Sequence, residues 1–168
     1  SINKFNQWKG TSDTETLLEC ISILGLEDTL KHLNGMFAFA LLDREKNIIS
    51  LARDRIGEKP LYYGFNNGTF FFGSELKSFT PHPDWNPSID NNAMHLYLRH
   101  AYIPTPYSIY KNIYKLQPGT FIDFDIEQKK CSDIKSYWDL NTVISKSSQE
   151  RISLNDSDLV NNLNARLK

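Results

Sequence analysis

Three charged residues, Arg53, Asp54 and Arg55, form the most unusual polar group of the chain because they directly follow an apolar stretch at 48–52. Charges that leave water need partners, and a planar guanidinium can bind several oxygen atoms at once. A Gly-x-Lys-Pro turn at 57–60 lies next to the triplet. We therefore interpret the triplet as a self-neutralising brace of that loop, with a structural and not a catalytic role.

The other residue types that perform nucleophilic or metal chemistry lack the spacing that such sites need. The four histidines have no acid or cysteine partner at ligand spacing. Cys20 and Cys131 lie far apart without a CxxC pair, so neither a disulfide framework nor a zinc site is expected. The glycines fall in turns and at strand ends and form no phosphate-binding loop. We expect this chain to bind no metal.

Asp13 lies in Ser12-Asp13-Thr14-Glu15, which reads as a capping box at the start of a helix. Ser12 is expected to accept a hydrogen bond from the amide of Glu15, whose side chain reaches back to the cap. Apolar residues at helical spacing continue to Leu24, and Gly25 ends the helix. An acid in the first turn offsets the helix dipole. Without further information, Asp13 is interpreted as a residue that stabilises the helix.

The stretch from Leu33 to Phe79 is the expected core of the fold. Its first apolar run, 36–42, is unbroken, which predicts a central strand covered on both faces. Further strands are predicted at 48–52, 61–65 and 69–73, and the Asn-Asn-Gly sequence before the last of them predicts a tight hairpin. All four strands are expected in one antiparallel sheet.

Fewer elements are predicted after the core. Asp90 is expected to cap a helix that ends near His100. Alternation at 120–126 predicts a strand, with 134–138 as its hairpin partner. The Ser-rich segment 141–151 has no periodicity and is interpreted as an irregular linker. A last helix is expected to be capped by Asp156 or Ser157.

Composition excludes several classes of protein. The 168 residues, 40% of them hydrophobic, suffice for one domain with a core. The net charge of −1 gives no reason to expect nucleic acid or a membrane as partner. No apolar run approaches the roughly 20 residues of a membrane-spanning helix, and no signal peptide is evident, so a cytoplasmic location is expected. Both ends, Ser1 and Lys168, are expected to lie inside a longer polypeptide.

Four motifs follow one another in an informative order. They are TSDTETLL at 11–18, LNGMFAFALLD at 33–43, LARDRIGEKPLYYG at 51–64 and FGSELKSF at 72–79. Together they resemble the second half of a class II glutamine amidotransferase domain, in which RDxxGxxPL, here 53–61, is a shared pattern.

Two later segments indicate which kind of amidotransferase the sequence resembles. The passage YLRHAYIPTPYSIYKNIYKLQPGTF at 97–121 is similar to one in glutamine-hydrolysing asparagine synthetases. SYWDL at 136–140 and DLVNNLNARLK at 158–168 resemble the start of their synthetase domain. The resemblance implies an α+β fold: a partial N-terminal-nucleophile fold, incomplete, with antiparallel sheets layered with helices. It also implies residues 1–140 as the C-terminal part of the glutaminase domain, 141–152 as a linker, and 153–168 as the truncated first helix of the synthetase domain.

The activity implied by the resemblance is that of a ligase in asparagine biosynthesis. Glutamine hydrolysis supplies ammonia, which amidates aspartate in an ATP-dependent reaction at the synthetase domain. ATP and Mg would bind in that domain, and no cofactor is expected on this fragment. The implied partners are glutamine and the remainder of the same polypeptide. Whether the parent enzyme forms a homodimer is left undecided.

The residue that hydrolyses glutamine in this family is an N-terminal cysteine activated by its own amino group, and the sequence contains no such residue. Ser1 is not expected to replace it, because Ile2-Asn3-Lys4 supplies no strand behind it. We therefore expect no catalytic residue in this chain, and we expect the fragment alone to be inactive.

The resemblance carries over one binding residue. Asp13 matches the acid that receives the α-ammonium group of glutamine through a charge-assisted hydrogen bond. Four further residues match sequence motifs that recur in the family, and for them we expect structural or interdomain roles: Arg53, Asp54, Glu75 and Lys77.

Two other functions stay open at this point. The first is an asparagine-synthetase-like amidotransferase that makes another amide, for example in surface-polysaccharide biosynthesis, because the product depends on the synthetase domain. The second is a standalone, non-catalytic domain for binding or scaffolding.

Overall fold

The computed structural model describes residues 10, 12–149 and 155–167. The chain divides into two compact units, residues 1–138 and 139–168, which are described separately. In the part that the structure describes, no helix is long and apolar enough to cross a membrane.

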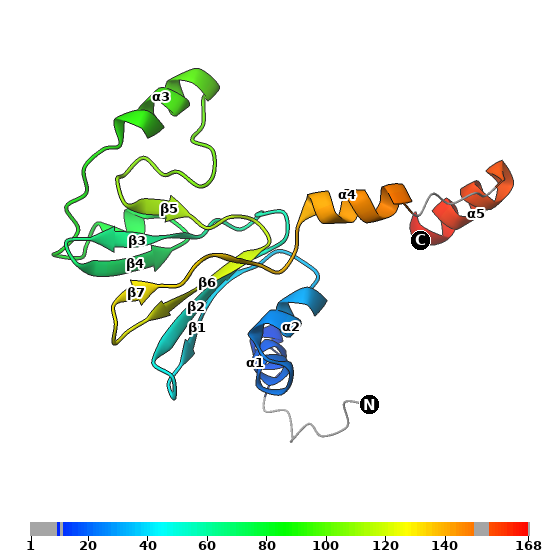
Figure 1. Cartoon of the computed structure of the whole chain (residues 1–168), viewed down its shortest axis with the longest axis horizontal. Coiled ribbons are helices and arrows are strands. Elements are labelled where there is room, and N and C mark those ends of the chain that lie inside the picture. Colours follow the sequence, from blue (N-terminus) through cyan, green and yellow to red (C-terminus); the bar gives the residue numbers. More distant parts are fainter. Residues whose placement is uncertain (1–9, 11, 150–154, 168) are drawn as a thin grey trace. The chain divides into compact units, whose positions relative to one another are not determined.

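The first unit contains helices and antiparallel strands (Figure 1). Its helices are α1 Asp13–Leu24, α2 Leu26–His32, the 3-10 helix η1 Leu76–Phe79, and α3 Asn91–His100. Its strands are β1 Ala38–Asp43, β2 Ile48–Arg53, β3 Tyr62–Asn66, β4 Thr69–Gly73, β5 Ile113–Lys115, β6 Thr120–Asp125, β7 Lys130–Cys131 and β8 Lys135–Ser136. The unit is therefore an α+β fold, as expected.

The strands form two sheets, so the expectation of one sheet is wrong. One sheet has the order β1-β2-β6-β7, with β8 also paired to β6, and the other has the order β4-β3-β5. The reason lies at 54–61, where the chain turns after β2 and starts β3 in a second layer. Leu51 of β2 and Leu61 then pack in one core cluster between the two sheets.

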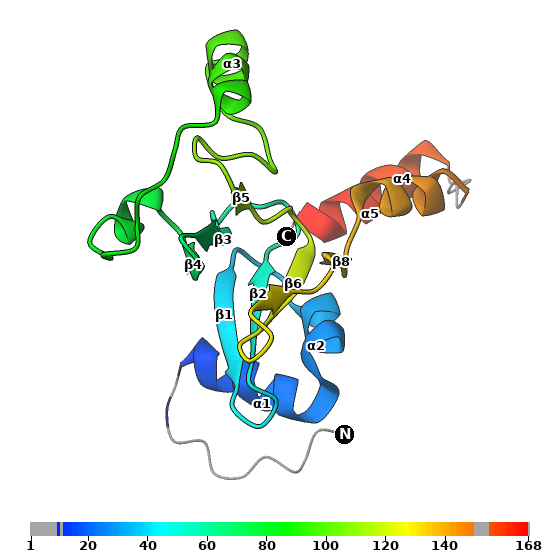
Figure 2. The same ribbon diagram turned by 60° about the vertical axis from the view of Figure 1, so that its left-hand side comes forward.

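Successive side chains of β2 explain how the layers are stacked. Neighbouring residues of a strand point to opposite faces. Leu51 packs toward the second sheet with Tyr63, whereas Ala52 packs with Leu30 of α2 and with Tyr137. The two helices α1 and α2 therefore belong to the layer opposite the second sheet (Figure 2). Aromatic contacts add to the sheet–sheet core, with the rings of Phe70 and Phe124 stacked at a centroid distance of 4.0 Å.

β1 is not the central strand that its unbroken apolar run predicted. Among the described residues it pairs with β2 alone, in the register Ala38 opposite Arg53 to Asp43 opposite Ile48. Leu42 is 50% exposed, while residues 50–53 of β2 are buried. β2 and β6 are the central strands of this sheet. An apolar run predicts that side chains are buried, but it does not predict how many neighbouring strands hydrogen-bond to its backbone.

Several local predictions are confirmed. The Asn67-Gly68 hairpin joins β3 to β4, and both residues have positive φ. Asp90 caps α3, accepting hydrogen bonds from the amides of Asn92 (2.8 Å) and Ala93 (3.4 Å). β6 follows its predicted range, and the predicted hairpin partner at 134–138 is confirmed in part by the short strand β8.

The second unit contains α4 Leu140–Gln149 and α5 Asp156–Leu167. The irregular conformation expected at 141–151 is therefore wrong over 141–149, and 150–151 lie outside the described residues. The role of 141–152 as a linker between two domains stays a prediction. Asp139 explains the helix because it accepts the Thr142 amide at 2.8 Å and so caps α4. In α5 the capping side chain is Asn155, which accepts the amide of Asp158 at 3.0 Å, in place of Asp156 or Ser157.

Candidate functional site

A cavity of about 580 Å³ lies where α1, the segment before β1 and the loop before β3 meet. Its walls are mostly apolar, with a few polar groups among them, which is typical of small-molecule sites. The lining residues are Asp13, Thr14, Leu17, Leu33, Asn34, Gly35, Met36, Phe37, Ala38, Phe39, Lys59, Pro60 and Ser74.

Asp13 stands on the wall of this cavity at the start of α1. Its Oδ1 atom lies 3.4 Å from the Ser12 hydroxyl and 3.5 Å from the Thr14 hydroxyl, and both hydroxyls can donate to it. The side chain is exposed, and the ion pairs among the described residues leave it unpaired. No cation of the described residues therefore neutralises this carboxylate, which can bind a cationic group in the cavity.

The cap of α1 differs from the predicted capping box. The Ser12 hydroxyl accepts the amide of Thr14 at 3.2 Å and not that of Glu15. The Glu15 carboxylate reaches back as expected, but it accepts the amide of Gly10 at 2.9 Å. Asp13 accepts neither of these backbone amides, so its carboxylate stays available to a ligand. Gly25 ends the helix with a φ of 79°, as predicted.

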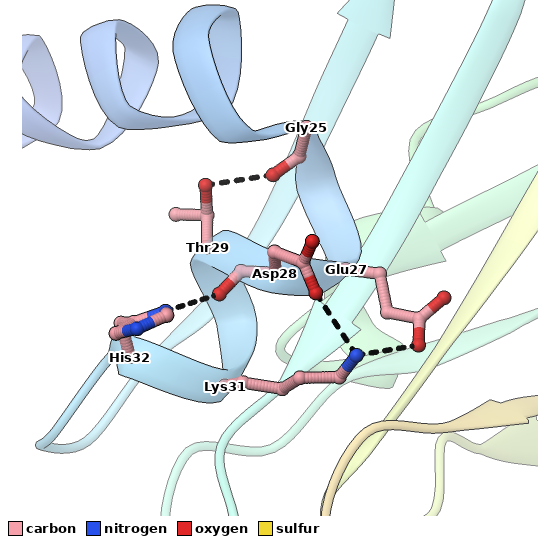
Figure 3. Close-up of polar contacts among 6 residues, drawn as sticks. All are labelled: Gly25, Glu27, Asp28, Thr29, Lys31 and His32. Carbon is pink, nitrogen blue, oxygen red and sulfur yellow. Dashed lines mark hydrogen bonds and ion pairs between the residues drawn. The ribbon is translucent and has the colours of Figure 1, made fainter.

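α2 precedes the segment that forms one wall of the cavity, and Figure 3 shows the polar contacts that hold this helix. The Thr29 hydroxyl donates to the carbonyl of Gly25 at 2.7 Å, and His32 Nδ1 lies 2.7 Å from the carbonyl of Asp28. Lys31 Nζ bridges Glu27 (2.9 Å) and Asp28 (3.0 Å) along the exposed side of the helix. These contacts set the helix end from which residues 33–37 run into β1.

Arg53 holds the loop at 57–60 through its side chain. Its guanidinium donates to three carbonyl oxygens, those of Lys59 (2.8 Å), Leu116 (2.6 Å) and Gly57 (2.5 Å). Burial lowers the pKa of Arg53, and the nearby negative charge of Asp54 opposes that effect. The Arg53 carbonyl in turn accepts the hydroxyl of Tyr137 at 2.7 Å.

Asp54 is 1% exposed and serves as an acceptor for five backbone amides. Oδ1 accepts those of Ile56 (3.2 Å), Gly57 (2.6 Å) and Glu58 (2.9 Å). Oδ2 accepts those of Lys59 (3.0 Å) and Phe37 (3.3 Å). Burial raises the pKa of Asp54, but the bonds from the backbone amides outweigh burial and leave the pKa below its ordinary value.

The structure changes one detail of the predicted brace. Arg53 and Asp54 both bind the 56–60 loop, but no direct ion pair joins them in the described part of the chain. Each charge is satisfied by backbone groups. Arg55 contributes separately, donating to the carbonyl of Lys31 at 2.8 Å.

Glu75 directly precedes η1 and Lys77 lies within it; both side chains are exposed, and they pair with each other at 2.7 Å. The hydrogen bond from Lys77 to Glu75 raises the pKa of Lys77. They do not line the cavity, although the preceding residue, Ser74, does. Their structural or interdomain role stays a prediction.

Several lining residues were not predicted from the sequence, in particular Phe37, Lys59 and Ser74. Among the described residues that line the cavity, Lys59 and Asp13 are the two that carry a charge. The available signal for Phe37, Lys59 and Ser74 was their place in three of the family-like motifs, at 33–43, 51–64 and 72–79. The meeting of 37, 59 and 74 depends on the turn between the two sheets, which no local pattern describes.

Two other cavities in the described part of the chain contain none of the predicted site residues. One of about 570 Å³ lies between the sheets, with Tyr63, Tyr114 and Cys131 in its lining. Burial raises the pKa of the Cys131 thiol, which makes it a poor nucleophile. Over residues 10, 12–149 and 155–167, no three His, Cys, Asp or Glu side chains gather at a distance suited to a metal ion.

Comparison with known proteins gives the family. A family model described as "Glutamine amidotransferase domain" matches residues 2–138. The putative asparagine synthetase [glutamine-hydrolyzing] 2 of Methanocaldococcus jannaschii is 39% identical over 140 residues, which is 82% of this chain and 27% of the relative. Asparagine synthetase [glutamine-hydrolyzing] 3 of Bacillus subtilis is 36% identical over 138 residues, which is 82% of this chain and 22% of the relative.

A third relative has a different name. Amidase chyE of Penicillium rubens is 30% identical over 138 residues, which is 80% of this chain and 19% of the relative. The chain thus spans about a quarter of the length of these curated relatives or less. The family model covers both the Asp13 helix and the Arg53–Asp54 brace, and the chain belongs to the glutamine amidotransferase domain family.

Proposed function

We propose that this chain forms part of the glutamine-binding site of a cytoplasmic, glutamine-hydrolysing asparagine synthetase. Glutamine hydrolysis supplies ammonia, and the ammonia amidates aspartate in an ATP-dependent reaction at a synthetase domain of the same polypeptide. The observation that carries the proposal is the exposed carboxylate of Asp13, which forms no ion pair with the other described residues, on the wall of a mostly apolar cavity in a chain that belongs to the amidotransferase family.

In this proposal Asp13 binds the α-ammonium group of glutamine. A carboxylate and an ammonium form a charge-assisted hydrogen bond, which is about twice as strong as a neutral one. The apolar walls at Leu17 and Phe39 suit the methylene groups of the substrate. Asp13 thereby fixes the amino-acid end and leaves the side-chain amide to reach the nucleophile.

The nucleophile is proposed to be an N-terminal cysteine of the longer polypeptide. Residues 1–168 are therefore proposed to be inactive alone, and glutamate release by this purified chain would contradict that. ATP and Mg are proposed to bind in the synthetase domain of the longer polypeptide.

The test uses the full-length protein and the variant Asp13→Ala. Loss of the charged partner should raise the KM for glutamine by roughly tenfold or more, since hydrogen bonds to charged groups are worth about 1.5–3 kcal/mol. Asparagine synthesis from added ammonium should stay near the wild-type rate, because ammonium bypasses the glutamine site.

Glu19→Ala provides the matched control, because Glu19 is an exposed acid on the same helix that does not line the cavity. It should leave both reactions unchanged. An equal loss of the glutamine-dependent and the ammonium-dependent reaction in Asp13→Ala would remove Asp13 from the glutamine site.

A second candidate differs only in the acceptor. It is an asparagine-synthetase-like amidotransferase that forms another amide, and the observation that keeps it open is a 30% identical relative with a different name, Amidase chyE. Supplying aspartate alone and then other carboxylic acids, with AMP release as the measurement, separates the two. If the full-length protein neither hydrolyses glutamine nor forms an amide, a non-catalytic binding domain is the remaining function.

A further inference from the structure

We infer that Asp54 is a positioning residue for glutamine, because its carboxylate fixes the backbone of two cavity walls. The inference rests on the proposed function and adds to it a residue that does not touch the substrate. Asp54 itself is absent from the cavity lining, whereas two of its five hydrogen-bond donors, Phe37 and Lys59, belong to it.

The two carboxylate oxygens of Asp54 accept hydrogen bonds from different parts of the chain. Oδ1 accepts the amides of 56–58 and so closes the turn that follows β2. Oδ2 accepts the amides of Phe37 and Lys59, which come from segments 22 positions apart in the sequence. A turn needs only the first set. The second set joins the start of β1 to the loop before β3, and both segments line the cavity.

Each wall residue is held at its carbonyl group as well as at its amide. The Asp54 amide donates to the carbonyl of Phe37 at 2.9 Å. Arg53 Nε donates to the carbonyl of Lys59 at 2.8 Å. Two adjacent residues, Arg53 and Asp54, therefore hold both backbone groups of both wall residues. The separation of the two walls is set by this pair.

Gly57 shows how closely the loop is packed onto the pair. It has a φ of 76°, and a Cβ atom there would lie 2.8 Å from Pro118 Cγ and 3.0 Å from Arg53 Cζ. The loop can approach the guanidinium only because this position has no side chain. Such packing leaves the 57–60 loop little freedom to change the width of the cavity.

Asp54→Asn is the informative variant because it affects the oxygens unequally. An asparagine that keeps its carbonyl oxygen on the three-donor side closes the turn as before. Its NH₂ group then faces the amides of Phe37 and Lys59, which are donors and lose their acceptor. The substitution therefore releases the cavity walls selectively.

The experiment measures glutamine hydrolysis, glutamine-dependent synthesis and ammonium-dependent synthesis in the full-length protein. Asp54→Asn should raise the KM for glutamine about tenfold, because displaced cavity walls weaken contacts with the substrate. The kcat for glutamine hydrolysis and the ammonium-dependent rate should change far less. This split between KM and kcat is not produced by a fall in the amount of folded enzyme, which lowers all the rates together.

Asp43→Asn is the matched control. Asp43 Oδ1 also accepts two backbone amides, those of Glu45 and Lys46, both at 3.0 Å, but in the turn after β1 and away from the cavity. The control should leave the KM for glutamine unchanged. An unchanged KM in Asp54→Asn, or equal KM increases in both variants, would overturn the inference.

Amide hydrogen exchange on the unmodified protein decides the question if Asp54→Asn fails to fold. Saturating L-glutamine should slow exchange in the segments 36–39 and 57–60 and leave the turn at 44–47 unaffected. Glutamine binding without protection of these two segments would overturn the positioning role of Asp54 and leave the proposed function intact. Absence of glutamine hydrolysis in the wild-type protein would instead overturn the proposed function, together with this inference.

Discussion

At the scale of single residues, the most consequential group is the buried carboxylate of Asp54. It is almost fully shielded from water, and the five amides that it accepts come from two separate segments of the chain. Hydrogen bonds to a charged acceptor are stronger than neutral ones. They keep the carboxylate ionised in spite of its burial, as its lowered pKa indicates.

This lowered pKa predicts how stability depends on pH. A carboxyl group with a depressed folded-state pKa stabilises the protein fully above its unfolded-state value, about 4. That contribution is lost as the pH falls through the folded-state pKa. Urea unfolding of the chain between pH 7 and pH 2 should show the free energy of unfolding falling below about pH 4.

Asp54→Asn should reduce the free energy of unfolding at pH 7 by about 2–3 kcal/mol, the typical cost of losing bonds to a charged group. Its stability should then depend less on pH below about 4 than that of the wild-type chain. Parallel curves for the two proteins over the whole pH range would show that folding does not lower the pKa of Asp54.

The sequence identified some of these residues and not others. The Arg53–Asp54 pair stands out in the sequence because its charges directly follow an apolar stretch, whereas Asp13 was selected through the family resemblance of its motif. Phe37 and Lys59 could not be selected as cavity residues, because their proximity results from a tertiary turn. The partners of the capping side chains were also partly wrong, since Ser12 and Glu15 bind Thr14 and Gly10.

At the scale of elements, side-chain patterns located the strands well but not their neighbours. The β3–β4 hairpin and α3 were predicted from turn and cap residues, which act locally. Assignment of β3 to a second sheet depends on the loop at 54–61, and the edge position of β1 depends on backbone pairing. Neither property is encoded in the periodicity of one segment.

Gly64 tests the pairing of the second sheet. It lies in β3 with a φ of 153°, and a Cβ atom there would overlap the Asn112 carbonyl oxygen and lie 2.9 Å from Ile113 Cα. Gly64→Ala should therefore disrupt the pairing of β3 with β5 and reduce the free energy of unfolding by about 3 kcal/mol or more, in the upper range for single substitutions.

Gly68→Ala is the control for this substitution. Gly68 also has a positive φ, 78°, but nothing lies within 4 Å of the added Cβ atom. Backbone strain alone should cost about 1–2 kcal/mol there. Chemical denaturation of both variants measures the difference, and equal losses would show that the close approach of β5 does not constrain Gly64.

At the scale of the whole molecule, the first unit stacks a helical layer, one sheet and a second sheet. The cavity lies at the junction of all three, with Asp13 from the helical layer, residues 36–39 leading into the first sheet, and Lys59 and Ser74 flanking the second. The brace of Arg53 and Asp54 lies at the crossing between the sheets. The fold thus brings two opposite charges, those of Asp13 and Lys59, to one apolar cavity.

The measurement that tests the proposed site most directly compares two substrates in the full-length protein. L-Glutamine carries an α-ammonium group, and 4-carbamoylbutanoate is the same molecule without it. Ammonia release gives kcat/KM for each. The wild-type protein should prefer glutamine by at least about tenfold, the minimum expected from one charge-assisted bond, and Asp13→Ala should abolish most of that preference. An equal preference in the wild-type protein and the variant would show that Asp13 does not bind the ammonium group.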